Sequence, residues 1–192
     1  MLIGDVSGKG PEAAALTSLT RHTLRTAGMG GNGFLPSPIE SLSILNRALL
    51  ADTTTTRFST VLYARVCPGE DGALLTLASG GHPDSLVLRA DGTLERIDVR
   101  GTLVGGVIDP EFKERDVRLR HSDLLLAYTD GVTELRTRDP LYGDRRLEET
   151  LRGLAGASAE QVVEEVRQMA VELQDGPPRD DIAVLALRMT GP

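Results

Sequence analysis

Hydrophobic positions follow a helical period near residues 42–49 and form strand-like runs elsewhere in the chain. Leu42, Leu45 and Leu49 recur at the spacing that places side chains on one face of a helix. Two predicted helices open with a capping box, Ser-Pro-Ile-Glu at 37–40 and Ser-Ala-Glu-Gln at 158–161. The predicted helices cover residues 13–27, 38–50, 145–154 and 159–173.

Strands are predicted in the apolar and β-branched runs between and outside these helices. Asp91-Gly92, between two short apolar runs, is a two-residue hairpin signal. The nearly continuous apolar run 124–128 predicts a strand covered on both faces, and residues 117–119 are predicted to pair with it as an antiparallel neighbour. The predicted strands are 1–3, 58–66, 74–78, 86–88, 117–119, 124–128 and 182–189.

The order of these elements is strand, two helices, several strands, two helices, strand. Helices that are grouped in pairs around consecutive strands are typical of an α+β protein with antiparallel sheets, and not of alternating β-α-β units. The sequence has no repeat, no low-complexity tract and no interdomain linker. A length of 192 residues suits one domain, so we expect residues 1–192 to form a single domain.

Composition and charge exclude several classes of function. Hydrophobic residues make up 40% and charged residues 26% of the chain, as in ordinary soluble proteins. The net charge of −7, without a basic patch, excludes nucleic acid as a partner. Cys67 is the only cysteine, so neither an internal disulfide nor a cysteine-based zinc site is possible. No apolar run reaches the roughly 18–20 residues of a membrane span, and we expect a cytoplasmic protein without a membrane partner.

Three short acidic motifs lie at the edges of strand-like runs. They are Gly-Asp-Val-Ser-Gly-Lys-Gly at 4–10, Thr-Asp-Gly-Val at 129–132 and Arg-Asp-Asp at 179–181. Strand ends are where a sheet can bring distant carboxylates together. Clustered carboxylates, with few histidines and one cysteine, favour hard cations such as Mg²⁺ or Mn²⁺. The pattern therefore predicts a metal-dependent site for phosphoryl transfer or hydrolysis.

The first motif does not have the spacing of a phosphate-binding P-loop. Only three residues separate Gly4 from Gly8, and Lys9 is followed by glycine instead of serine or threonine. Its glycines also fit a structural strand-to-helix turn beside Asp5. Taken alone, such a turn is more often structural than catalytic.

The other two acidic motifs have structural interpretations as well. Asp130-Gly131 is an ordinary hairpin dipeptide, and Asp180-Asp181 can cap the turn before the last strand. Adjacent like charges, however, resist being brought together unless a cation neutralises them. His82 is expected to have a structural role in a turn, and Glu134 to face solvent or stabilise a turn. The metal hypothesis therefore rests on the combination of motifs.

Taken in order, these motifs resemble the signature of bacterial stage II sporulation protein E-type serine phosphatases. That family belongs to the metal-dependent, phosphatase 2C-like (PPM) superfamily. The resemblance begins at residues 4–10 and covers essentially the whole chain. Its further parts are Phe-Ser-Thr at 58–60, Ala-Ser-Gly-Gly-His-Pro at 78–83, the segment 101–105, Tyr-Thr-Asp-Gly-Val-Thr-Glu at 128–134, Tyr-Gly at 142–143 and Asp-Asp-Ile-Ala-Val at 180–184.

The resemblance implies a four-layer α-β-β-α sandwich, in which two antiparallel sheets face each other and a helix pair covers each outer side. It also implies a stretch before Gly4 with another acidic motif on a strand. Because Met1 lies so close to Asp5, we expect this chain to lack amino-terminal strands of the family fold. The sheet edge exposed by their absence predicts pairing with a second copy, as a homodimer.

The resemblance also implies roles for the acidic residues. Asp5 is expected to bridge two Mn²⁺ or Mg²⁺ ions, and the carbonyl of Val6 to lie near one of them. Asp130 and Asp180 are expected to complete the shell of the other ion, with Asp181 as the alternative to Asp180. Two cations about 3.5–4 Å apart lower the pKa of a bridging water and orient it for in-line attack on phosphorus. They also neutralise charge on the phosphoryl oxygens.

The main hypothesis is a Mn²⁺- or Mg²⁺-dependent protein serine/threonine phosphatase. By resemblance, its substrate is a phosphorylated anti-sigma-factor antagonist or a similar regulatory protein, and an upstream sensor domain is an expected partner. The alternative is a catalytically impaired regulatory module of the same fold, which binds a partner protein without turnover.

Overall fold

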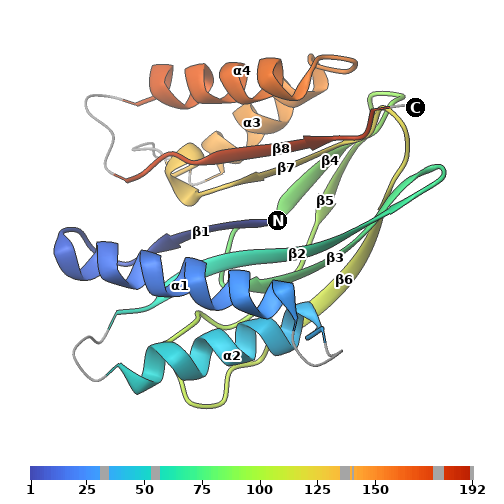
Figure 1. Ribbon diagram of the computed structural model, residues 1–192. Helices are drawn as coiled ribbons and strands as arrows, with labels where there is room; N and C mark the ends of the chain where they lie inside the picture. The colour runs from blue at the N-terminus through green and yellow to red at the C-terminus, as the bar shows by residue number, and fades with distance from the viewer. Residues whose placement is uncertain (31–34, 53–56, 135–138, 140, 175–179, 191–192) are drawn as a thin grey trace. The chain divides into compact units, whose positions relative to one another are not determined.

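The computed structural model describes residues 1–30, 35–52, 57–134, 139, 141–174 and 180–190. Over these residues the chain forms two compact units, each built around a four-stranded sheet and a pair of helices (Figure 1). The first unit comprises 1–67, 75–82 and 99–117, and the second comprises 68–74, 83–98 and 118–192. Among the described residues, no helix is both long enough and apolar enough to cross a membrane.

The first unit contains a sheet with the strand order β1-β2-β3-β6. Its strands are β1 (Leu2–Val6), β2 (Ser59–Gly69), β3 (Gly72–Gly80) and β6 (Lys113–Leu119). Helices α1 (Pro11–Met29) and α2 (Pro38–Ala51) lie side by side in this unit (Figure 1). The buried cluster that joins helices and sheet consists of Leu16, Leu24, Leu42, Leu45, Leu49, Val61, Ala78 and Val104.

The second unit contains an antiparallel sheet with the strand order β5-β4-β7-β8. Its strands are β4 (Ser85–Leu88), β5 (Leu94–Ile97), β7 (Leu124–Tyr128) and β8 (Val184–Arg188). A 3₁₀ turn, η1 (Asp130–Val132), follows β7, and the helices are α3 (Tyr142–Arg152) and α4 (Ala159–Glu172). Every residue of β7 is buried, as its continuous apolar run predicts.

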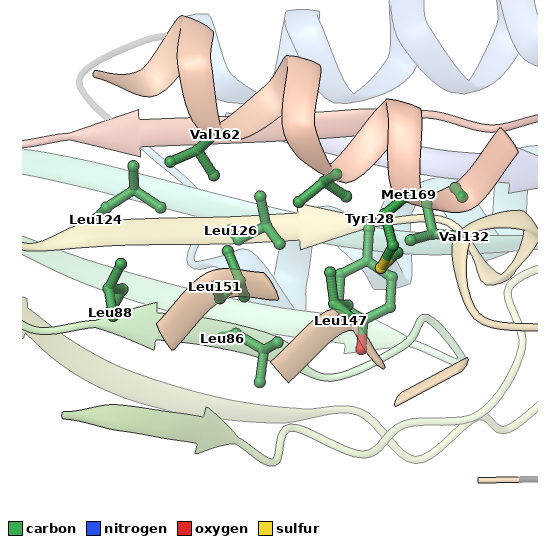
Figure 2. Packing of buried hydrophobic residues seen from close by; sticks show 12 residues of the cluster. Leu86, Leu88, Leu124, Leu126, Tyr128, Val132, Leu147, Leu151, Val162 and Met169 are labelled. Atoms are coloured by element: carbon green, nitrogen blue, oxygen red, sulfur yellow. The ribbon is translucent and has the colours of Figure 1, made fainter. Parts of the chain in front are cut away.

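Apolar side chains fill the space between this sheet and its two helices (Figure 2). Leu86 and Leu126 come from neighbouring strands, since β4 and β7 pair in a register that places them opposite each other. Leu147 comes from α3 and Val162 from α4, and both are fully buried. The rest of the buried cluster is Leu88, Leu124, Tyr128, Val132, Leu151, Val166, Met169 and Ala170.

Both predicted capping boxes are confirmed. Ser37 Oγ accepts from the Glu40 N–H at 3.2 Å, while the Glu40 carboxylate accepts from the Ser37 N–H at 2.7 Å. Ser158 and Gln161 form the same pair at the start of α4, at 3.2 and 2.8 Å. Each box satisfies two amide donors that have no partner within the helix.

The predicted pairing of residues 117–119 with 124–128 is wrong. Strand β6 belongs to the sheet of β3, whereas β7 lies between β4 and β8. The physical reason lies in the turn before β7, where the Asp123 carboxylate accepts from the N–H groups of Arg120 and Ala90 at 2.9 and 3.0 Å. Ala90 lies two residues after the end of β4, so this carboxylate links the start of β7 to the end of β4.

Most other boundaries agree with the prediction within a few residues. The Asp91-Gly92 turn joins β4 to β5, with Gly92 at a φ of 84°. Helix α3 starts at Tyr142, earlier than predicted, and β8 starts at Val184, later than predicted. Antiparallel sheets with helices grouped in pairs are the predicted α+β class.

Candidate functional site

Asp5 lies within a strand, because β1 continues to Val6 instead of ending at Ile3 as predicted. It pairs with Thr60 of β2, and Val6 pairs with Ser59. The side chain of Asp5 is half-buried. The strand register therefore fixes the backbone of both residues that the sequence assigns to a metal site in this unit.

Glycines shape the backbone on both sides of Asp5. A Cβ on Gly4 would lie 2.5 Å from the carbonyl oxygen of Thr60, which is too close for any side chain. Gly8 and Gly10 have φ angles of 89° and 92°, in the region that favours glycine. Pro11 then occupies the first turn of α1, where a missing N–H costs nothing. The turn after Asp5 is thus shaped by its glycines, as its composition predicts.

His82 supports the strand that pairs with Asp5. The residue is 6% exposed, and its Nδ1 lies 3.1 Å from Oγ1 of Thr60. Its backbone N–H donates to Ser79 Oγ at 3.1 Å within the same turn. These contacts confirm the structural role in a turn that was expected for His82.

Asp130 begins η1, directly after β7, and its backbone carbonyl stabilises that turn. The carbonyl accepts from the N–H groups of Thr133 and Glu134 at 2.9 and 2.7 Å. Glu134 itself is exposed, as expected. Asp130 therefore lies at the carboxyl end of a buried strand, in a short helical turn that fixes its backbone.

Thr129 and Gly131 bring the segment after residue 179 against this turn. Oγ1 of Thr129 donates to the carbonyl of Asp181 at 2.8 Å and accepts from the N–H of Ala183 at 2.9 Å. A Cβ on Gly131 would lie 2.7 Å from the same Asp181 carbonyl, so only glycine permits this approach. The Thr-Asp-Gly motif thus positions the Asp-Asp pair as well as Asp130.

The carboxylates of Asp130 and Asp180 interact electrostatically. Burial raises the pKa of Asp130, and the negative charge of Asp180 raises it further. Oδ1 of Asp130 is buried and, among the described residues, accepts no hydrogen bond. Asp180 and Asp181 are both exposed, and Asp180 Oδ1 accepts from the Asp181 N–H at 3.0 Å. Arg179 of the same motif lies outside the described residues.

A cation fits these features of the second unit. A buried carboxylate oxygen that has no hydrogen bond needs a positive partner, and two neighbouring carboxylates repel each other without one. An all-oxygen donor set suits Mg²⁺ or Mn²⁺.

Sequence reasoning identified Asp130 and Asp180 but missed the part played by Thr129. Its hydroxyl is the group that holds the two acidic segments together. The signal was present, since a threonine preceding Asp-Gly at the end of a buried strand is a polar side chain where apolar ones prevail.

Together, the antiparallel sheets, their grouped helices and the paired aspartates define an α+β protein with a candidate site for a divalent cation. The profile of Stage II sporulation protein E (SpoIIE) matches residues 1–190. The chain therefore belongs to the stage II sporulation protein E family.

Two curated proteins show how far the similarity extends. Phosphoserine phosphatase RsbU of Bacillus subtilis is 29% identical over 187 residues, which are 97% of this chain and 54% of that protein. Protein IcfG of Synechocystis is 25% identical over 211 residues, covering 97% of this chain and 33% of that protein. The chain thus spans between one third and about half of the length of these relatives.

Solved structures confirm the predicted α+β sandwich fold. The RsbU and RsbW domains of Rv1364c from Mycobacterium tuberculosis match with a TM-score of 0.80 and 23% identity, over 100% of this chain and 51% of that one. The PP2C phosphatase domain of SpoIIE from Bacillus subtilis matches with a TM-score of 0.76 and 18% identity, over 98% and 52%.

Proposed function

We propose that this chain is a metal-dependent protein phosphatase that hydrolyses phosphoserine or phosphothreonine on a regulatory protein. The observation that carries the proposal is Oδ1 of Asp130, which is buried beside Asp180 and accepts no hydrogen bond from any described residue. The relatives support the reaction class, since RsbU is named a phosphoserine phosphatase.

In the proposed site, four residues would hold two Mn²⁺ or Mg²⁺ ions. Asp5 would serve as the bridging ligand, Val6 would provide its carbonyl oxygen, and Asp130 and Asp180 would provide carboxylate oxygens. Asp180 is favoured over Asp181 because it is the charge of Asp180 that raises the pKa of Asp130. When bound, such ions supply an activated water and neutralise the charge on the phosphoryl oxygens.

Other residues of the protein position the proposed metal ligands. Thr129 holds the backbone of Asp181, so the neighbouring Asp180 carboxylate stays near Asp130. The pairing of β1 with β2 fixes the backbone of Asp5 opposite Thr60. The hydrogen bond between Thr60 and His82 stabilises this part of β2. We propose that both units together form one catalytic domain over residues 1–192, because the family match runs through both.

We further propose a phosphorylated anti-sigma-factor antagonist as the substrate. RsbU and the Rv1364c structure, which contains an RsbW domain beside its RsbU domain, support this substrate class. The homodimer, the upstream sensor domain and the cytoplasmic location remain predictions from the sequence.

The test is phosphate release from a phosphoserine protein with Mn²⁺ and with excess chelator. We expect Mn²⁺-dependent turnover, and we expect Asp130→Asn to reduce kcat/KM at least about 100-fold. The reason is that metal ions lower the activation free energy by several kcal/mol, and about 1.4 kcal/mol corresponds to a tenfold change in rate. Asp180→Asn should act in the same direction, and Asp181→Asn much less. Glu164→Gln, an exposed charge change on α4, is the matched control.

The alternative, a module that binds a partner without turnover, predicts a different result. Wild type would then release phosphate no faster than Asp130→Asn at any Mn²⁺ concentration. That outcome, with Mn²⁺ bound and the protein folded, would overturn the phosphatase proposal.

A further inference from the structure

Arg57, just before β2, spans the glycine turn that follows Asp5. Its Nη1 donates to the carbonyl of Ser7 at 2.7 Å. Its Nε and Nη2 donate to Oε2 of Glu12, in the first turn of α1, at 3.3 and 3.1 Å. One guanidinium therefore connects the end of β1 to the start of α1. All of these residues lie within the first unit.

Gly8 makes room for this guanidinium. A Cβ placed on Gly8 would lie 1.6 Å from Nη1 of Arg57, well inside any possible contact. The φ angle of 89° at Gly8 also disfavours other residues. Glycine at position 8 is therefore needed both for the conformation of the turn and for the space that the Arg57 guanidinium occupies.

Ser7 and Phe58 continue the pairing of β1 with β2 beyond Val6. The Ser7 N–H donates to the Phe58 carbonyl at 2.9 Å, and Ser7 Oγ accepts from the Phe58 N–H at 3.1 Å. The Arg57 contact fastens the carbonyl of the same serine. The N–H, the carbonyl and the hydroxyl of Ser7 therefore all form hydrogen bonds. Ser7 directly follows Val6 and lies two residues after Asp5.

We propose that Arg57 is a positioning residue for the metal site, acting through Ser7 on Asp5 and on the carbonyl of Val6. The inference rests on the proposed function. Hydrogen bonds from a charged donor are roughly twice as strong as neutral ones, and the planar guanidinium reaches two acceptors at once, which the single ammonium of lysine does not.

The exposure of this pair separates positioning from general stability. The side chain of Arg57 is 26% exposed and that of Glu12 is 68% exposed, and exposed ion pairs contribute little to folding. Loss of Arg57 should therefore disturb the turn locally while the rest of the protein stays folded.

The experiment compares wild type with Arg57→Ala and Arg57→Lys in three measurements. They are hydrogen exchange of the Ser7 to Gly10 amides in metal-free protein, Mn²⁺ titration by calorimetry, and the Mn²⁺ dependence of phosphate release. We expect about 10-fold to 100-fold weaker Mn²⁺ binding in Arg57→Ala, as for other groups that orient metal ligands. In Arg57→Ala, hydrogen exchange at the Ser7 amide should be faster, and KM for the phosphoprotein should be unchanged. Arg57→Lys should recover only part of the Mn²⁺ affinity.

Two controls make the result specific. Arg167→Ala removes an exposed arginine that pairs with Glu164 on α4, and it should change none of the three measurements. Gly8→Ala keeps the arginine but places a methyl group where Nη1 lies and also strains the backbone at a φ of 89°, so it should weaken Mn²⁺ binding at least as much as Arg57→Ala.

The outcomes distinguish this inference from the proposed function. Wild-type Mn²⁺ affinity in a folded Arg57→Ala variant would overturn the positioning role, whether or not the Ser7 amide exchanges faster. If wild type binds Mn²⁺ but releases no phosphate, the phosphatase proposal fails, while weaker Mn²⁺ binding in Arg57→Ala still supports the positioning role. If wild type binds no Mn²⁺, both proposals fail.

Discussion

At the scale of single residues, Asp123 shows how a buried charge can serve the fold and not the site. Its side chain is 4% exposed, yet the carboxylate is ionised beside Arg89, with Nη1 of that arginine 2.8 Å from Oδ2. Burial alone would raise the pKa of Asp123, but the N–H groups of Arg120 and Ala90 and the Arg89 guanidinium lower it overall. Asp130 is the reverse case: burial and the charge of Asp180 raise its pKa overall, although the backbone N–H of Gly131 lowers it, and among the described residues its Oδ1 accepts no hydrogen bond.

We predict that Asp123→Asn destabilises the protein by about 1–3 kcal/mol at pH 7, because buried donors then face an amide instead of a carboxylate. A carboxyl group with a lowered folded-state pKa stabilises the protein above its unfolded pKa of about 3.9, and this stability is lost as the pH falls through the lower value. The difference between wild type and variant should therefore shrink in acid. Urea unfolding at pH 7 and near pH 3 measures it, with exposed Asp71→Asn as the control. A difference that is independent of pH would contradict the assignment.

The sequence suggests candidate ligands where the chemistry lies in the motif itself. Asp5, Asp130 and Asp180 are proposed because their acidic motifs, taken in order, resemble those of a metal-dependent phosphatase family. Arg57 and Thr129 were not found, because their roles depend on contacts with Ser7 and Asp181 that are 50 and 52 positions away. Nothing in the sequence around Arg57 indicates its partner, whereas Thr129 is a polar residue at the end of an apolar strand and could have been singled out.

At the scale of elements, local signals proved reliable, but one predicted strand pairing did not form. The capping boxes at Ser37 and Ser158 depend on neighbours three positions away, and both formed. The contact between Asp123 and the N–H of Ala90 joins residues 33 positions apart, and the predicted pairing of β7 with residues 117–119 was wrong. Sequence adjacency of two strands does not decide which strands share a sheet.

The cap of α4 gives a prediction at this scale. Ser158→Ala removes the hydroxyl that accepts from the Gln161 N–H, so we expect a loss of about 1 kcal/mol in the free energy of unfolding. The effect should reach the core, because α4 contributes Val162 and Val166 to the buried cluster. Equilibrium urea unfolding measures the loss, and Ser158→Thr, which keeps the hydroxyl, should retain most of the stability. Equal losses in both variants would rule out the cap as the cause.

At the scale of the whole molecule, the family match and the proposed ligand set both include residues of the two compact units. The profile spans residues 1–190 and so includes both compact units. The proposed ligands are also divided, with Asp5 and Val6 in the first unit and Asp130 and Asp180 in the second. The proposed ligand set therefore predicts that substitution of a ligand in either unit weakens metal binding.

The proposed ligand set can be tested without a substrate. A ligand that binds only the folded protein stabilises it by about 2.7 kcal/mol at 100 times its dissociation constant. Mn²⁺ should therefore raise the thermal unfolding midpoint of wild type, and calorimetry with and without chelator measures the shift. Asp5→Asn and Asp130→Asn should each abolish most of it, although they lie in different units. Arg167→Ala should leave the shift intact. If Asp130→Asn abolishes the shift but Asp5→Asn does not, the cation is held by the second unit alone, and the bridging role of Asp5 is wrong.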